Sequence, residues 1–253
     1  MTEKGRHGDP GQWIGRGVVL GAAILAVGVV MFVSTRMVPE PGLITLPTSL
    51  PPQSGCATAA TPGSLCIVIL GDSIGQGVPL TGDDRWWVRL QHLLATALPG
   101  RTVTIDNWAV SGSHVEVLES AARDQPEIGT YDVAIIIEGV NDVGTLSVDV
   151  WQPRYEAAVA ALEARGVIPI VTTPPPSFEN GAFGTRHDAT AAAIRALAAS
   201  GRRFVLDLAT RWRADGPTLA GTYYADSIHQ SQAGQVLMST MARDVVLAAD
   251  PGP

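Results

Sequence analysis

Cys66-Ile67-Val68-Ile69-Leu70, followed directly by Gly71-Asp72-Ser73, is the stretch of sequence that decides the fold class. Five consecutive apolar residues that stop at a glycine are typical of a strand in a parallel sheet, which is buried on both faces. Four later short segments also have strand character, at residues 103–107, 133–137, 167–172 and 204–208. The sequence therefore predicts five strands.

Helical patterns alternate with these strands. Apolar residues recur at helical spacing in residues 86–98, 114–123, 154–165, 188–200 and 232–248. Strand–helix alternation of this kind predicts a three-layer α/β/α sandwich around a five-stranded parallel sheet. We expect the folded domain to cover residues 65–249, with a short tail at 250–253, and functional residues to lie just past the carboxyl ends of the strands.

Polar residues cluster at the expected places. Three clusters follow the first three strands and a fourth precedes the last helix: Gly71-Asp72-Ser73, Ser111-Gly112-Ser113, Gly139-Val140-Asn141-Asp142 and Asp226-Ser227-Ile228-His229. Ester hydrolysis by a serine enzyme needs a nucleophile, a base, a group that orients the base, and donors for the developing oxyanion. These four clusters contain residues suited to every one of those roles.

Specific residues can be assigned to the chemistry. Ser73 can attack, and His229 can take its proton, because a serine hydroxyl is a weak nucleophile without an adjacent base. Asp226 lies three residues before His229 and can orient its imidazole ring. The backbone N–H groups of Ser73 and Gly112 and the side-chain amide of Asn141 are the candidate oxyanion donors.

Taken together, the four clusters resemble the SGNH, or GDSL, hydrolases in their order and spacing. The resemblance covers residues 65–249. It implies a serine ester hydrolase that forms an acyl-enzyme on Ser73, with Asp226 and His229 completing the triad and with Gly112 and Asn141 as oxyanion donors. No cofactor is expected, and no metal site is expected because neither Cys56 nor Cys66 lies in a metal-ligand pattern. The family often has proline after the histidine, where this chain has Gln230, a departure that does not touch the chemistry.

Each of these residues also has a structural interpretation. Ser73 could cap a helix, and Asn141 with Asp142 could form only a turn. His114 and His187 are competing candidates for the base. Asp72 and Asp142 are expected to brace loops. Of Trp86 and Trp87, one is expected in the core, and the other could border the acyl pocket.

Composition excludes several functions. The formal net charge is −7 and no basic patch runs through the domain, which argues against a nucleic-acid partner. Lys4 is the only lysine, so the chain has neither the Tyr-x-x-x-Lys pair of short-chain dehydrogenases nor the lysine of a P-loop. A nucleotide-dependent oxidoreductase is thereby excluded. The remaining alternative is a non-catalytic, tethered binding module on a degenerate hydrolase fold.

The N-terminal residues predict a membrane anchor. The sequence divides into a basic leader at 1–16, an apolar run at 17–36 that is long enough for a transmembrane helix, and a Pro-rich linker at 37–64. The positive-inside rule keeps the leader in the cytoplasm, so the hydrolase domain is expected outside, acting on a small-molecule or cell-envelope ester. Secretion after signal-peptide cleavage is the alternative.

Two cysteines are present. Cys56 lies in the linker and Cys66 in the first strand, ten positions apart. In an oxidising compartment they are expected to form a disulfide that ties the linker to the domain.

Overall fold

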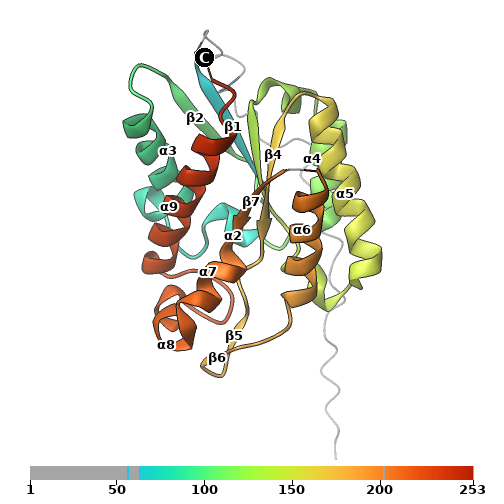
Figure 1. Ribbon diagram of the computed structural model, residues 1–253, viewed down its shortest axis with the longest axis vertical. Coiled ribbons are helices and arrows are strands. Elements are labelled where there is room, and N and C mark those ends of the chain that lie inside the picture. The colour runs from blue at the N-terminus through green and yellow to red at the C-terminus, as the bar shows by residue number, and fades with distance from the viewer. Residues whose placement is uncertain (1–55, 57–62, 202, 253) are drawn as a thin grey trace, which may run out of the picture. The chain divides into compact units, whose positions relative to one another are not determined.

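A computed structural model of the chain describes residue 56 and residues 63–201 and 203–252. Its main sheet has five strands, all parallel, in the order β2-β1-β3-β4-β7 (Figure 1). Their bounds are β1 Leu65–Gly71, β2 Val103–Asn107, β3 Val133–Ile137, β4 Ile168–Thr173 and β7 Phe204–Asp207. The five predicted strands are confirmed, with shifts of one residue at some ends.

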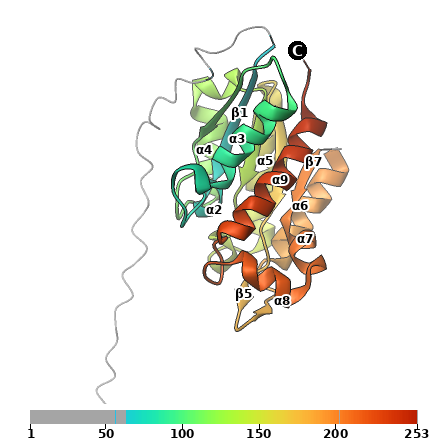
Figure 2. The same ribbon diagram turned by 90° about the vertical axis from the view of Figure 1, so that its left-hand side faces the viewer.

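Helices cover both faces of this sheet. One face packs against α3 (Trp86–Ala97) and α9 (Gln232–Ala249), and the other against α4 (Val115–Asp124), α5 (Val148–Ala164) and α6 (Asp188–Gly201) (Figures 1 and 2). The predicted three-layer α/β/α sandwich is confirmed. Helix α4 connects β2 to β3, and α5 connects β3 to β4. Parallel strands need such crossover connections, and both helices pack against the sheet.

Strand β1 shows why its sequence is apolar throughout. Leu65, Ile67 and Ile69 belong to the core on the α3–α9 side, and Val68 and Leu70 belong to the core on the α4–α6 side. Successive side chains of a strand point to opposite faces. Because both faces are covered, all seven residues of β1 are buried.

Shorter elements complete the domain. They are the helices α2 (Ser73–Gln76), α7 (Leu208–Ala214) and α8 (Gly216–Ala220), the hairpin strands β5 (Phe178–Glu179) and β6 (Ala182–Phe183), and the 3₁₀ helices η1 (Gly82–Asp84), η2 (Pro126–Thr130), η3 (Asp142–Gly144) and η4 (Gly221–Tyr223). The sequence patterns do not predict them. Most of them lie at the carboxyl edge of the sheet or beside it, where the polar clusters also lie.

The predicted leader at 1–16, the predicted transmembrane helix at 17–36 and nearly all of the linker at 37–64 lie outside the described residues. Within residues 63–201 and 203–252, no helix combines the length and apolar character needed to cross a bilayer. The membrane anchor therefore stays a prediction from the sequence.

The structure corrects the predicted disulfide. Cys56 and Cys66 are both buried, and both are free thiols. The Cys56 thiol donates to the carbonyl oxygen of Thr104, at 3.9 Å from Sγ. Burial raises the pKa of both thiols. Since disulfide exchange starts from a thiolate, burial keeps this pair in its unreactive protonated form.

Candidate active site

Ser73 lies on a sharp turn between β1 and α2. Gly71 adopts a φ of +140°, and a Cβ at this position would lie 1.7 Å from the carbonyl oxygen of Ile137 on the neighbouring strand. Only glycine fits such a close approach. Asp72 then caps α2, because its Oδ1 accepts a hydrogen bond from the Ile74 N–H at 2.8 Å. The Gly-Asp-Ser sequence therefore builds the turn that presents Ser73.

Trp86 holds this turn in place through hydrogen bonds to its backbone. It is fully buried, and its indole N–H donates to the carbonyl oxygens of Ile74 and Gly75 at 3.0 and 3.2 Å. Its neighbour Trp87 is half-buried and donates to the carbonyl oxygen of Gln76 at 3.2 Å. The expectation that one of the two tryptophans packs in the core is confirmed for Trp86.

Three side chains meet across the carboxyl edge of the sheet. The Oγ of Ser73 lies 2.9 Å from Nε2 of His229, although the two residues are 156 positions apart in the chain. The other ring nitrogen of His229, Nδ1, lies 2.8 Å from Oδ2 of Asp226. The structure thus brings the predicted Ser, His and Asp into one connected chain of hydrogen bonds.

The Asp226–His229 loop is held in shape by its own carboxylate. Oδ1 of Asp226 accepts hydrogen bonds from the backbone N–H groups of Ile228 and His229, at 2.8 and 2.7 Å. Partial burial opposes ionisation, but these bonds and the contact with the His229 ring lower the pKa of Asp226 below its usual range. The carboxylate is therefore ionised at neutral pH and can stabilise an imidazolium at His229.

The hairpin β5–β6 packs against the Asp226–His229 loop and supports it. The Phe178 N–H donates to the carbonyl oxygen of Ser227 at 2.9 Å. The ring of Phe178 stacks on Tyr224 at a centroid distance of 5.3 Å, just before the loop begins. This hairpin is one of the elements that the sequence patterns did not predict, and it positions Asp226 and His229.

The candidate oxyanion donors are also in place. Within the described part of the chain, neither the Ser73 N–H nor the Gly112 N–H has a hydrogen-bond acceptor. Gly112 adopts a φ of +80°, which favours glycine. One amide hydrogen of Asn141 is donated to the Ser113 carbonyl oxygen at 2.8 Å, which orients the side chain and leaves its second hydrogen available.

The competing histidines have other partners. Nδ1 of His114 lies 3.3 Å from Oδ1 of the buried Asp142, and Nδ1 of His187 lies 2.9 Å from the carbonyl oxygen of Pro175. Asp72 and Asp142 brace loops, as expected: Asp72 caps α2, and Asp142 accepts from the Val115 N–H at 3.3 Å. Burial raises the pKa of Asp72 to about 7 and also raises that of Asp142.

Glu138 is a buried residue of the site that the sequence analysis missed. Ser113 Oγ lies 2.9 Å from both the Gly71 carbonyl oxygen and Oε2 of Glu138, and the Gly139 N–H donates to Oε1 of Glu138 at 3.1 Å. A hydroxyl has one hydrogen and a carbonyl oxygen can only accept, so both contacts are satisfied when Glu138 is protonated and donates to Ser113. Burial and the nearby carboxylates of Asp72 and Asp142 raise its pKa well above the usual value, in agreement.

Glu138 thereby links the ends of β1 and β3 to the segment that carries Gly112. The sequence could have indicated a role for Glu138, because its carboxylate directly follows an all-apolar strand and directly precedes the Gly-x-Asn-Asp cluster. A charged residue type at the end of a buried strand needs partners, and here the partners are the loops of the oxyanion hole.

Two substitutions of Glu138 distinguish its role in positioning the oxyanion loops from an effect of its charge. Glu138→Ala is expected to lower kcat by about 10- to 100-fold with a smaller change in KM, because displaced oxyanion donors act mainly in the transition state. Glu138→Gln keeps an acceptor for Gly139 and a donor for Ser113, so it is expected to retain most of the activity. Steady-state kinetics with a chromogenic ester measures both. Equal losses in the two variants would contradict this interpretation.

The fold is an α/β/α sandwich around a parallel sheet. At the carboxyl edge of this sheet lie a hydrogen-bonded Ser–His–Asp triad and free oxyanion donors. Together they define the chain as a serine ester hydrolase. Residues 69–237 match the family model of the GDSL-like lipase/acylhydrolase family, and the chain belongs to that family.

Solved structures share the fold. An acetyl xylan esterase, AlAXEase, is 21% identical with a TM-score of 0.60, over 71% of this chain and 99% of its own. The lipase/acylhydrolase from Enterococcus faecalis is 21% identical with a TM-score of 0.61, and the match covers 73% of this chain and 96% of that one. The psychrotrophic esterase EstA from Pseudoalteromonas sp., in a structure inhibited by monoethylphosphonate, is 18% identical with a TM-score of 0.56. The match covers 72% of this chain and 96% of that one. No curated protein matches the sequence.

Proposed function

We propose that the chain hydrolyses carboxylic esters outside the cytoplasm, through an acyl-enzyme on Ser73. The observation that carries the proposal is the pair of contacts from Ser73 Oγ to His229 and from His229 to Asp226, at 2.9 and 2.8 Å. The base His229 is then within hydrogen-bond reach of both the nucleophile and the orienting group.

The reaction follows from this arrangement. His229 Nε2 takes the proton of Ser73 as Oγ attacks the ester carbonyl carbon, and the carbonyl oxygen becomes an oxyanion facing the Ser73 and Gly112 N–H groups and the Asn141 amide. The imidazolium, stabilised by Asp226, gives its proton to the departing alcohol as the C–O bond breaks. Water then repeats the sequence on the acyl-enzyme and releases the acid, which restores Ser73.

The substrate class is a lipid, acyl or O-acetyl glycan ester. Similarity to an acetyl xylan esterase and to a lipase/acylhydrolase supports this range of esters. The open position of the triad supports large substrates, because 53% of the Asp226 side chain and 25% of the His229 side chain are exposed. A scissile bond that projects from a polymer or a membrane could reach such an edge.

The test is activity and covalent labelling of the purified full chain. Acyl esters of graded chain length and O-acetylated glycans are offered in parallel, and a fluorophosphonate probe reports an activated serine independently of the substrate. We expect labelling at Ser73 and turnover of at least one ester. A folded protein that is neither labelled nor active would instead be the non-catalytic binding module.

The proposed location rests on the sequence of residues 1–64. With an uncleaved helix at 17–36, protease added to intact cells is expected to remove the domain and leave a membrane-bound fragment, since the positive leader stays inside. Cell fractionation with antibodies to each end of the chain measures this. A domain that stays protected in intact cells would contradict the external location. A soluble form that starts after Ser34 would show cleavage of a signal peptide.

A further inference from the structure

His114 and Asp142 form a second His–Asp pair, next to the candidate oxyanion donors. Nδ1 of His114 lies 3.3 Å from Oδ1 of Asp142. His114 lies two residues after Gly112 in the segment between β2 and α4. Asp142 directly follows Asn141 in the segment between β3 and α5. The pair therefore joins the two segments that carry these donors, and the mechanism proposed above uses neither member of it.

The residues just before the pair join the same two segments. The Asn141 side chain donates to the Ser113 carbonyl oxygen at 2.8 Å. Two successive residues of one segment, Ser113 and His114, thus contact two successive residues of the other. The distance between the Gly112 N–H and the Asn141 amide therefore depends on both contacts.

The carboxylate of Asp142 also holds the start of α4. This helix begins at Val115, and its N-cap residue, His114, makes no side-chain capping hydrogen bond. Oδ1 of Asp142 accepts from the Val115 N–H instead, at 3.3 Å. The first N–H groups of a helix have no partners within the helix and favour a negative charge nearby. A carboxylate from the Asn141 segment therefore fixes the helix that follows the Gly112 segment.

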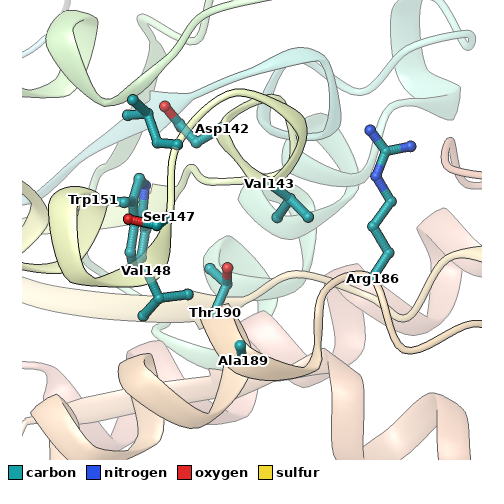
Figure 3. Close-up of a pocket in the computed structure, with 9 residues that line it drawn as sticks. Asp142, Val143, Ser147, Val148, Trp151, Arg186, Ala189 and Thr190 are labelled. Atoms are coloured by element: carbon teal, nitrogen blue, oxygen red, sulfur yellow. The ribbon is translucent and has the colours of Figure 1, made fainter.

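Few other contacts hold the Asp142 side chain. It is 2% exposed, and its second oxygen, Oδ2, is buried without a hydrogen-bond partner among the described residues. Burial raises the pKa of Asp142, and the Val115 N–H and the His114 ring oppose that rise. Asp142 also borders a cavity of about 220 Å³ between the first turns of α5 and α6 (Figure 3). Because side chains do not fill this space, the position of Asp142 depends on the two contacts of its Oδ1.

We propose that His114 is a positioning residue of the oxyanion hole and acts through Asp142. Its Nδ1–H donates to Asp142, and this contact keeps the Gly112 and Asn141 segments at the separation that their donors need. The proposal rests on the proposed ester hydrolysis and adds a residue to its machinery. Misplaced oxyanion donors lose stabilisation mainly in the transition state, so the effect of His114 belongs in kcat and not in KM.

Conservative variants of His114 in the full chain test the proposal. The amide nitrogen of asparagine can take the place of Nδ1, and the amide nitrogen of the longer glutamine can take the place of Nε2. We expect His114→Ala and His114→Gln to lower kcat by about 5- to 30-fold with little change in KM, the size expected for one lost hydrogen bond. The rate of phosphonylation of Ser73 by a fluorophosphonate should fall in parallel. His114→Asn keeps a donor toward Asp142 and should retain most of both activities.

His92→Ala is the matched control. His92 is exposed on α3, on the other face of the sheet, and its replacement should leave kcat, KM and phosphonylation unchanged. Thermal unfolding shows whether every variant is folded. Activity that survives in His114→Gln but not in His114→Asn would mean that the ring acts through Nε2, and this overturns the proposal. A loss confined to KM, or wild-type kcat in His114→Ala, overturns it as well.

Amide hydrogen exchange tests the pair without any turnover. The Val115 N–H is bonded to Asp142, so a peptide that contains Val115 is expected to exchange faster in His114→Ala than in the wild type or in His114→Asn. If the wild type neither hydrolyses an ester nor reacts with the fluorophosphonate, the proposed function fails. The exchange measurement then decides the pair alone: faster exchange only in His114→Ala supports it, and equal exchange in all three proteins overturns it.

Discussion

Ser73→Ala protein is expected to be folded and inactive toward every ester that the wild type hydrolyses, with kcat lower by roughly 10⁴- to 10⁶-fold. The reason is that Oγ of Ser73 is the atom placed to attack with His229 as its base, 2.9 Å away. Steady-state kinetics and fluorophosphonate labelling measure the loss, and both should disappear together.

The control for this variant is Ser227→Ala. Ser227 lies in the same Asp226–His229 loop and is exposed, and the loop uses its carbonyl oxygen, not its hydroxyl, to hold Phe178. It should keep wild-type turnover, and thermal unfolding should show that both variants are folded. Near wild-type activity in Ser73→Ala would remove Ser73 from the mechanism.

The order of the strands explains why the functional residues converge. The chain runs from β1 to β2 on one side and then crosses to β3 on the other, so β1 and β3 are paired neighbours. The helices that follow them, α3 and α5, lie on opposite faces of the sheet. Ligands of open parallel sheets bind at such a switch point. Ser73 follows β1 and Asn141 follows β3, so nucleophile and oxyanion donor lie on the two sides of that crevice.

The sequence predicted the centre of the sheet well because the three central strands, β1, β3 and β4, are buried on both faces. An all-apolar run such as Val133–Ile137 is rich in β-branched residues and too short for a typical helix, which favours a strand. The start of α5 was predicted less well. The helix begins at Val148, six residues before the predicted start at 154, and Pro153 lies inside it. A proline normally argues against a helix interior, so the local pattern indicated a later start.

Other features depended on contacts that no local pattern encodes. The β5–β6 hairpin has two residues in each strand and is held by stacking of Phe178 on Tyr224, from a distant part of the chain. The state of Cys56 and Cys66 depends on burial, which spacing alone does not give. Asp226 and His229 could be predicted because their spacing of three residues is itself the geometric requirement.

Asn141→Ala is expected to lower kcat by about 100- to 1000-fold with little change in KM. Its amide donates one hydrogen to the Ser113 carbonyl oxygen at 2.8 Å, which leaves the second hydrogen free to donate to the developing oxyanion. A donor that matters mainly when charge develops on the substrate oxygen stabilises the transition state more than the bound ester. Steady-state kinetics with one ester gives both constants.

Asn141→Asp distinguishes this role from a structural one. The carboxylate is close in shape to the amide but, when ionised, cannot donate to Ser113 or to the oxyanion, and it places a negative charge where another negative charge develops. We therefore expect an equal or larger loss of kcat than in Asn141→Ala. The rate of phosphonylation of Ser73 by a fluorophosphonate should fall in parallel, because that reaction also develops negative charge on an oxygen at the same position. If the loss instead appears only in KM, and phosphonylation stays fast, Asn141 binds the substrate without stabilising the oxyanion, and the Ser73 and Gly112 N–H groups alone form the hole.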